Sequence, residues 1–202
     1  LVYAARLYRT AMELIASQPD IAYQLLISVT DTLAGIAFKE WKPDEVQMLK
    51  SRQALLDLAK KLGVANDVAR QLALETCRNN PWSKRKFVKF LIDHIDAIEL
   101  QSRDDLFPYL LPQHCPRTED VPAAIDSIYA ARSGNLHSAV PFPRSVKLGT
   151  APRLDLRDLP ESMFAPDTVP PVAWFERVVS LAVRRYLIGQ TPSASAFEPF
   201  KP

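Results

Sequence analysis

The sequence is poor in the residues that mark several classes of protein. It has two cysteines, Cys77 and Cys115, and no CxxC pair, which excludes a disulfide-rich secreted scaffold and favours a reducing, cytoplasmic compartment. Only five glycines occur among 202 residues, and neither a glycine-rich phosphate loop nor a GxSxG motif is present. Nucleotide hydrolysis by a P-loop is therefore excluded.

Metal-ligand patterns and long apolar runs are also missing. The three histidines, His94, His114 and His137, are far apart and match no metal-ligand spacing, so we expect neither a metal nor a cofactor. The longest apolar segment, 21–38, is interrupted by polar residues and falls short of the roughly 18 apolar residues of a membrane span. We therefore expect no membrane association. Because the first residue is Leu1 and not methionine, we expect the native chain to begin earlier.

The formal net charge of +2 is too small to indicate nucleic-acid binding through overall charge. A local patch would have to supply such binding. One candidate consists of Lys84, Arg85, Lys86 and Lys89, interleaved with aromatic residues. The alternative is that the aromatic residues belong to the core and the four basic residues form a solvated helix face.

The pattern of prolines and apolar residues predicts an all-α fold. Most of the 17 prolines lie in the second half of the sequence, and apolar residues recur at helical spacing. Helices are expected at 3–17, 21–38, 44–61, 66–78, 83–94, 118–136 and 172–188. The helix at 21–38 is apolar around most of its circumference, which predicts a buried central helix. The last helix should turn Phe175, Val178, Val179, Ala182 and Tyr186 inward. We predict one helical domain over 1–190, with a long proline-rich loop at 138–169, and a mobile tail at 191–202.

Arg132 is the most informative single residue. It falls in the middle of an apolar helix face formed by Val121, Ile125, Ile128, Tyr129 and Leu136. A guanidinium there needs an acid, a phosphate or a partly wet interface as its partner. A structural ion pair and a functional site are both consistent with this position.

The predicted central helix offers a partner for Arg132. Gln24, Ser28, Asp31 and Gly35 form a narrow polar stripe on it, and Asp31 is the only acid in the stripe. We hypothesise that Asp31 pairs with Arg132; the alternative is a stripe that faces water. A buried pair would make Asp31→Ala cost about 3–5 kcal/mol of stability.

His137 follows Arg132 by five positions, which places the two side chains about 140° apart on an unbroken helix. Gly134 and Asn135 tolerate other geometries, so the helix could end there and let both side chains reach one site. Alternatively, two copies of the chain assemble the pair across a two-fold axis. A solvated histidine near a helix end is the simplest interpretation.

The segment Tyr129-x-x-Arg132-Ser133-x-x-x-His137 resembles the signature of the HEPN superfamily, and the chain looks closest to the bacterial Apea-like HEPN proteins. The resemblance extends over most of the chain. It includes residues 8–34, which contain Asp31. It also includes the segment Phe87-Val-Lys-Phe-Leu-Ile and the segment Pro170-Pro-Val-Ala-Trp-Phe-Glu-Arg before the last helix.

The resemblance implies a compact helical bundle that forms a homodimer with both motifs at a cleft on the two-fold axis. Many members are metal-independent endoribonucleases. The resemblance also implies a role in defence or stress response, with an antitoxin or another regulatory partner. By resemblance, His137 acts on the ribose 2′-OH or the leaving oxygen and Arg132 holds the scissile phosphate. Tyr129, Ser133, Asn135 and Asp31 would support the site; many nucleases of the family have Asn, Asp or His where this chain has Ser133. Other members are non-catalytic dimerisation or nucleotide-binding modules.

Overall fold

The computed structural model describes residues 1–77, 82–95, 99–100, 115–147 and 169–190. These residues contain α-helices and short 3-10 turns and no β-strand, so the predicted all-α fold is confirmed for this part of the chain. The chain groups into two compact units, where the sequence predicted one domain: unit 1 comprises Leu1–Ala37 and Lys84–Pro202, and unit 2 comprises Phe38–Ser83. The predicted tail at 191–202 and most of the predicted loop at 138–169 lie outside the described residues.

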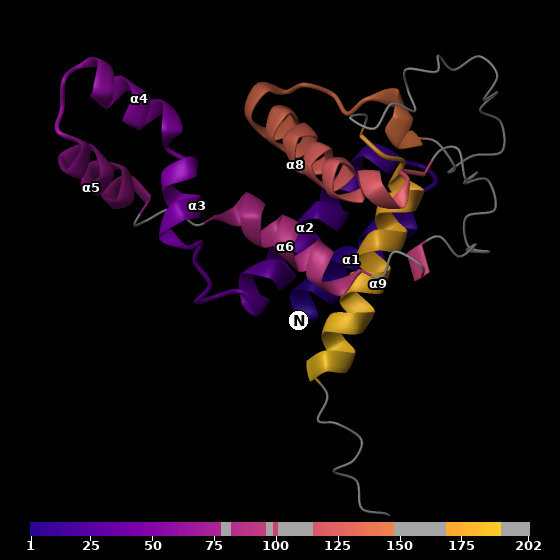
Figure 1. The fold of residues 1–202 in the computed structure, drawn as a ribbon. Helices are drawn as coiled ribbons and strands as arrows, with labels where there is room; N and C mark the ends of the chain where they lie inside the picture. Colours follow the sequence, from indigo (N-terminus) through magenta and orange to yellow (C-terminus); the bar gives the residue numbers. More distant parts are fainter. Residues whose placement is uncertain (78–81, 96–98, 101–114, 148–168, 191–202) are drawn as a thin grey trace, which may run out of the picture. The chain divides into compact units, whose positions relative to one another are not determined.

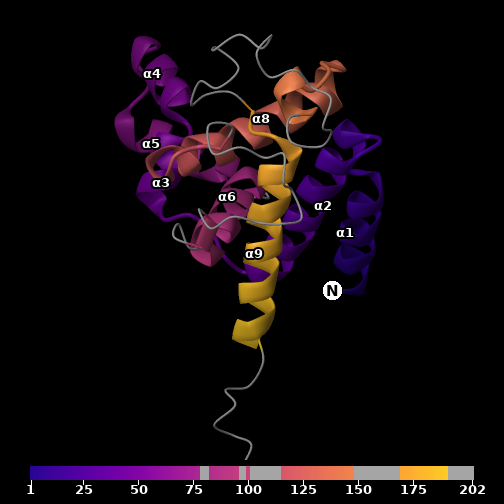
Figure 2. The ribbon, with the colours of Figure 1, turned by 90° about the vertical axis from the view of Figure 1, so that its right-hand side faces the viewer.

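Helix α2 (Pro19–Ala37) is the central helix of unit 1, as its apolar sequence predicts. Its buried residues are Pro19, Ala22, Tyr23, Leu26, Ile27, Val29, Thr30, Leu33 and Ala34. The helix packs against α1 (Val2–Leu14), α8 (Val121–Ser138) and α9 (Val172–Gln190). A short turn joins α1 to α2, and the two lie side by side (Figures 1 and 2).

Aromatic side chains join the other helices of unit 1 around α2. The ring of Phe87 on α6 (Ser83–His94) lies 5.3 Å from that of Tyr129 on α8 and 6.5 Å from that of Phe175 on α9. The Tyr23 ring of α2 lies 4.9 Å from Phe175. All five residues predicted to face inward from the last helix are buried. The core of unit 1 therefore fixes α8, which carries Arg132, against α2 and α6.

Helix α8 follows a 3-10 turn, η2 (Thr118–Asp120), and has Pro122 in its first turn. Its buried residues are Val121, Ala124, Ile125 and Ile128. The prediction that Leu136 is on the same core-facing side is wrong, because 52% of this residue is exposed. The last turns of α8 extend beyond the buried part of the helix, so their conformation depends on other contacts.

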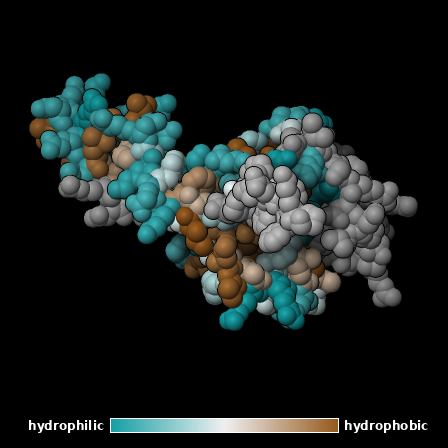
Figure 3. Space-filling model, turned by 90° about the horizontal axis from the view of Figure 1, so that it is seen from below, coloured by the Kyte–Doolittle hydropathy of each residue, from teal (hydrophilic) through white to brown (hydrophobic). Residues whose placement is uncertain are grey.

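One end of unit 1 exposes apolar side chains. They are Leu1 and Val2 at the start of α1, Ile36 near the end of α2, and Leu187 and Ile188 near the end of α9. Figure 3 views the molecule from this end and shows hydrophobic surface on it. Folded proteins commonly expose apolar atoms, so this surface alone assigns no partner.

Unit 2 contains α3 (Glu45–Lys50), α4 (Gln53–Lys61) and α5 (Asn66–Cys77). The single helix predicted at 44–61 is interrupted at Ser51 and Arg52. The Ser51 hydroxyl donates to the Met48 carbonyl at 2.6 Å, and the Arg52 guanidinium donates to the Thr76 carbonyl of α5 at 3.3 Å. The interruption lets α3 and α4 each pack against α5.

Two glycines of the chain should respond in opposite ways to replacement by alanine. Gly63 follows α4 with a φ of +71°, where a side chain is strained, so Gly63→Ala should lower stability by about 1 kcal/mol. Gly35 lies within α2, and a Cβ there meets nothing within 4 Å. Gly35→Ala should therefore raise stability by about 0.5–1 kcal/mol through helix propensity. Chemical denaturation measures both changes in unfolding free energy, and two changes of the same sign would contradict the expectation.

Candidate functional site

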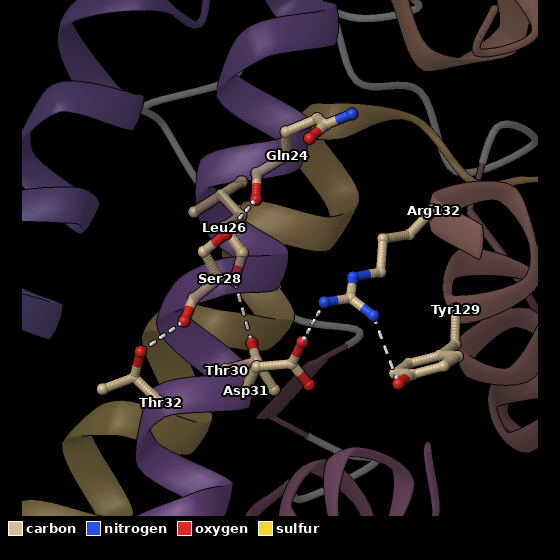
Figure 4. A network of polar contacts seen from close by, with 8 residues as sticks. All are labelled: Gln24, Leu26, Ser28, Thr30, Asp31, Thr32, Tyr129 and Arg132. Atoms are coloured by element: carbon tan, nitrogen blue, oxygen red, sulfur yellow. Dashed lines mark hydrogen bonds and ion pairs between the residues drawn. The ribbon is translucent and has the colours of Figure 1, made fainter. Parts of the chain in front are cut away.

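Arg132 on α8 forms an ion pair with Asp31 on α2, as hypothesised from the sequence. Arg132 Nη2 lies 3.0 Å from Asp31 Oδ2, and the two side chains are 28% and 21% exposed. Arg132 Nη1 donates to the Tyr129 hydroxyl at 3.3 Å, and the guanidinium lies 5.2 Å from the centre of the Tyr129 ring. Figure 4 shows the Arg132 side chain reaching from α8 towards α2. The structure thus brings Asp31, Tyr129 and Arg132 together at a partly exposed position.

The Asp31 carboxyl is affected by two opposing influences. Partial burial raises its pKa, because desolvation disfavours the charged form, and the charge of Arg132 lowers it. Burial is the larger influence, so the net pKa is above the ordinary value for an aspartate. An anion that reached Arg132 would compete with a carboxylate that has already lost part of its hydration.

The raised pKa of Asp31 predicts a pH dependence of stability. A carboxyl with a higher pKa in the folded chain than in the unfolded chain stabilises the fold most when it is protonated, and this contribution is lost as the pH rises through the folded-state pKa. Asp31→Asn removes the titration and keeps the shape. The unfolding free energy of the wild type minus that of Asp31→Asn should therefore fall as the pH rises through the acid range. A rising difference, measured by urea unfolding, would show that Arg132 dominates instead.

A second polar contact joins α2 to the end of α8. The Gln24 side-chain amide donates to the Asn135 side-chain carbonyl, and Asn135 Nδ2 donates to the Val140 carbonyl at 3.0 Å. The predicted stripe on α2 thus divides: Gln24 and Asp31 contact α8, whereas Ser28 and Gly35 are exposed. The Gln24 amide and the Asp31 carboxylate extend from the same side of α2 (Figure 4).

His137 is not brought to Arg132 within the chain. Helix α8 continues through Gly134 and Asn135 to Ser138, so the interpretation that the helix ends before His137 is wrong. On a continuous helix the two side chains are about 140° apart. His137 is exposed, whereas Arg132 faces Asp31. Ser133, beside Arg132, is half-buried.

The predicted RNA-binding patch is a surface of mixed charge. Lys84 Nζ lies 2.7 Å from a carboxylate oxygen of Asp126 on α8, and Lys89 Nζ lies 2.7 Å from Asp93 on its own helix. Arg85 and Lys86 are half-buried. The charges of Lys84 and Lys89 are therefore balanced by neighbouring acids.

No group of three or more His, Cys, Asp or Glu side chains that could hold a metal ion occurs within the described ranges. Among the same residues, no helix is both long and apolar enough to cross a membrane.

Comparisons with protein-family models, with curated proteins and with solved structures gave no match. The HEPN resemblance therefore remains an expectation from the sequence motif and its flanking segments.

Proposed function

We propose that the chain is a metal-independent endoribonuclease of the HEPN type, in which Arg132 and His137 form the site. The observation that carries the proposal is the placement of Arg132. Asp31 and Tyr129 fix the guanidinium, and 28% of the Arg132 side chain remains exposed. A fixed, partly exposed guanidinium suits the bidentate binding of a phosphate.

The chemistry needs no metal ion. The ribose 2′-oxygen attacks the adjacent phosphorus and the bond from phosphorus to the 5′-oxygen breaks, which leaves a cyclic phosphate and a 5′-hydroxyl. Arg132 stabilises the negative charge that develops on the phosphate. His137 accepts the 2′-hydroxyl proton or donates a proton to the leaving 5′-oxygen, and water takes part in the other proton transfer; histidine is the side chain that most often serves as a general acid or base.

The proposed enzyme is a homodimer. Arg132 and His137 diverge on one continuous helix, so in our proposal the Arg132 of one protomer acts with the His137 of its partner. The substrate is RNA and the proposed setting is a cytoplasmic defence or stress response, with an antitoxin or another regulatory partner, as the resemblance implies.

A second candidate function is a non-catalytic interaction or nucleotide-binding module. The observation in its favour is the Asp31 ion pair, which already balances the charge of Arg132. In this alternative the pair stabilises the packing of α8 on α2 and His137 has no catalytic role.

Incubation of the purified chain with a mixed RNA substrate in excess EDTA tests the proposal. We expect cleavage, with fragments that carry 5′-hydroxyl ends and cyclic or 3′-phosphates. Cleavage that stops when EDTA is added would contradict a metal-independent mechanism. Intact RNA after incubation with a folded dimer would favour the interaction module.

A further inference from the structure

The backbone that follows α8 is held at several points. Ala139 has a φ of +52°, and its N–H bonds the Gly134 carbonyl. The Val140 N–H also bonds the Gly134 carbonyl, at 3.3 Å, and the Val140 carbonyl accepts from Asn135 Nδ2 at 3.0 Å. Val140 is thus bound through both of its backbone polar groups to residues of α8.

The side chain of Asn135 is itself oriented from α2. Gln24 donates to its carbonyl oxygen, which leaves the Asn135 amide nitrogen directed to Val140. If the Asn135 side chain rotated, the bond to Val140 would be lost. Gln24 therefore acts on the end of α8 through Asn135.

Such an anchor matters at this helix end. The last carbonyls of a helix lack partners within the helix, and a left-handed conformation is unfavourable for alanine, so an unsupported turn of this kind frays. The last turns of α8 contain no fully buried residue, and His137 lies in them. Gln24 and Asp31 are seven residues apart on α2 and contact the α8 segments that carry His137 and Arg132, respectively.

We infer that Gln24 is a positioning residue: through Asn135 and Val140 it fixes the C-terminal turn of α8, on which His137 lies. The consequence for cleavage rests on the proposed ribonuclease function. The fixing of the turn does not rest on it and can be measured separately.

The test compares the wild type with Gln24→Ala by amide hydrogen exchange and by RNA cleavage. We expect exchange at Ala139 and Val140 to become at least about tenfold faster, with exchange in the core of α2 unchanged. We expect kcat to fall about 10- to 100-fold and KM to change little, because the variant displaces His137 and leaves Arg132 in place. Ser28→Ala is the matched control, since the exposed Ser28 hydroxyl bonds the Gln24 carbonyl of its own helix, at 3.0 Å, and no other group among the described residues.

A double variant, Gln24→Asn with Asn135→Gln, exchanges the two amide side chains and keeps their combined length. We expect it to restore slow exchange and a large part of kcat relative to Gln24→Ala. Unchanged exchange at Ala139 and Val140 in Gln24→Ala would overturn the inference, and faster exchange with wild-type kcat would overturn its consequence for cleavage. If the wild type does not cleave RNA, the proposed function fails, and the exchange rates alone decide whether Gln24 fixes the turn.

Discussion

Replacement of His137 by alanine should slow RNA cleavage by about 10²- to 10⁴-fold, and replacement of Arg132 by alanine should slow it by about 10²- to 10³-fold. The first range is typical of the loss of a general acid or base, and the second of the loss of a donor that stabilises charge in the transition state. Single-turnover rate constants in EDTA measure both effects without a contribution from product release.

Two controls separate these effects from damage to the fold. Ser138→Ala changes the neighbour of His137 on the same helix, and Arg9→Ala removes an arginine from an exposed pair with Glu13, with side-chain exposures of 83% and 59%. Both should keep the wild-type rate within about twofold. Arg132→Lys keeps a positive charge for Asp31 and loses the planar fork, so its rate should stay low while its stability recovers. Wild-type cleavage by folded His137→Ala would contradict the proposed role of His137.

Asp31→Ala should lower the unfolding free energy by about 1–3 kcal/mol. The change leaves the guanidinium of Arg132 half-buried without its acid, and an unsatisfied buried polar group has a cost of this size. This loss of unfolding free energy is smaller than the about 3–5 kcal/mol expected for a fully buried pair, because side-chain exposures of 21% and 28% let water solvate both charges in part.

A double-mutant cycle isolates the interaction. Arg132→Ala should cost a similar amount to Asp31→Ala, and the double variant should cost less than the sum of the two, with a coupling of about 0.5–3 kcal/mol. The exposed Arg9 and Glu13 pair provides the comparison, with an expected coupling below about 1 kcal/mol. Urea unfolding of the four proteins gives the value. Additive single effects for Asp31 and Arg132 would show that the ion pair does not stabilise the fold.

Helical periodicity was sufficient to predict the features that depend on one helix at a time. The apolar pattern around the circumference of 21–38 predicted a central helix. The five residues predicted to face inward from the last helix, among them Phe175 and Tyr186, are all buried. The partner of Arg132 could be predicted because the polar stripe of the central helix has a single acid, and a charge on an apolar face requires an opposite charge.

Apart from the Arg132–Asp31 pair, contacts between helices could not be predicted. Gly134 and Asn135 suggested an early helix end, but Asn135 is held by Gln24 of α2 and the helix continues past His137. The two amides have no charge, so nothing in the sequence marks them as a pair. The buried Glu176 is a similar case: it is 2% exposed and accepts a hydrogen bond from the hydroxyl of Tyr8 on α1, a partner remote in sequence.

The most direct test of the proposed site is a mixing experiment with two inactive variants. Arg132→Ala and His137→Ala chains are purified separately, combined under conditions that exchange protomers, and assayed for RNA cleavage in EDTA. If each site takes Arg132 from one protomer and His137 from its partner, a mixed dimer has one intact site. Because half of the dimers are mixed at equal concentrations, we expect recovery of about a quarter of the wild-type activity. Mixed dimers that form and remain as inactive as the separate variants would contradict it.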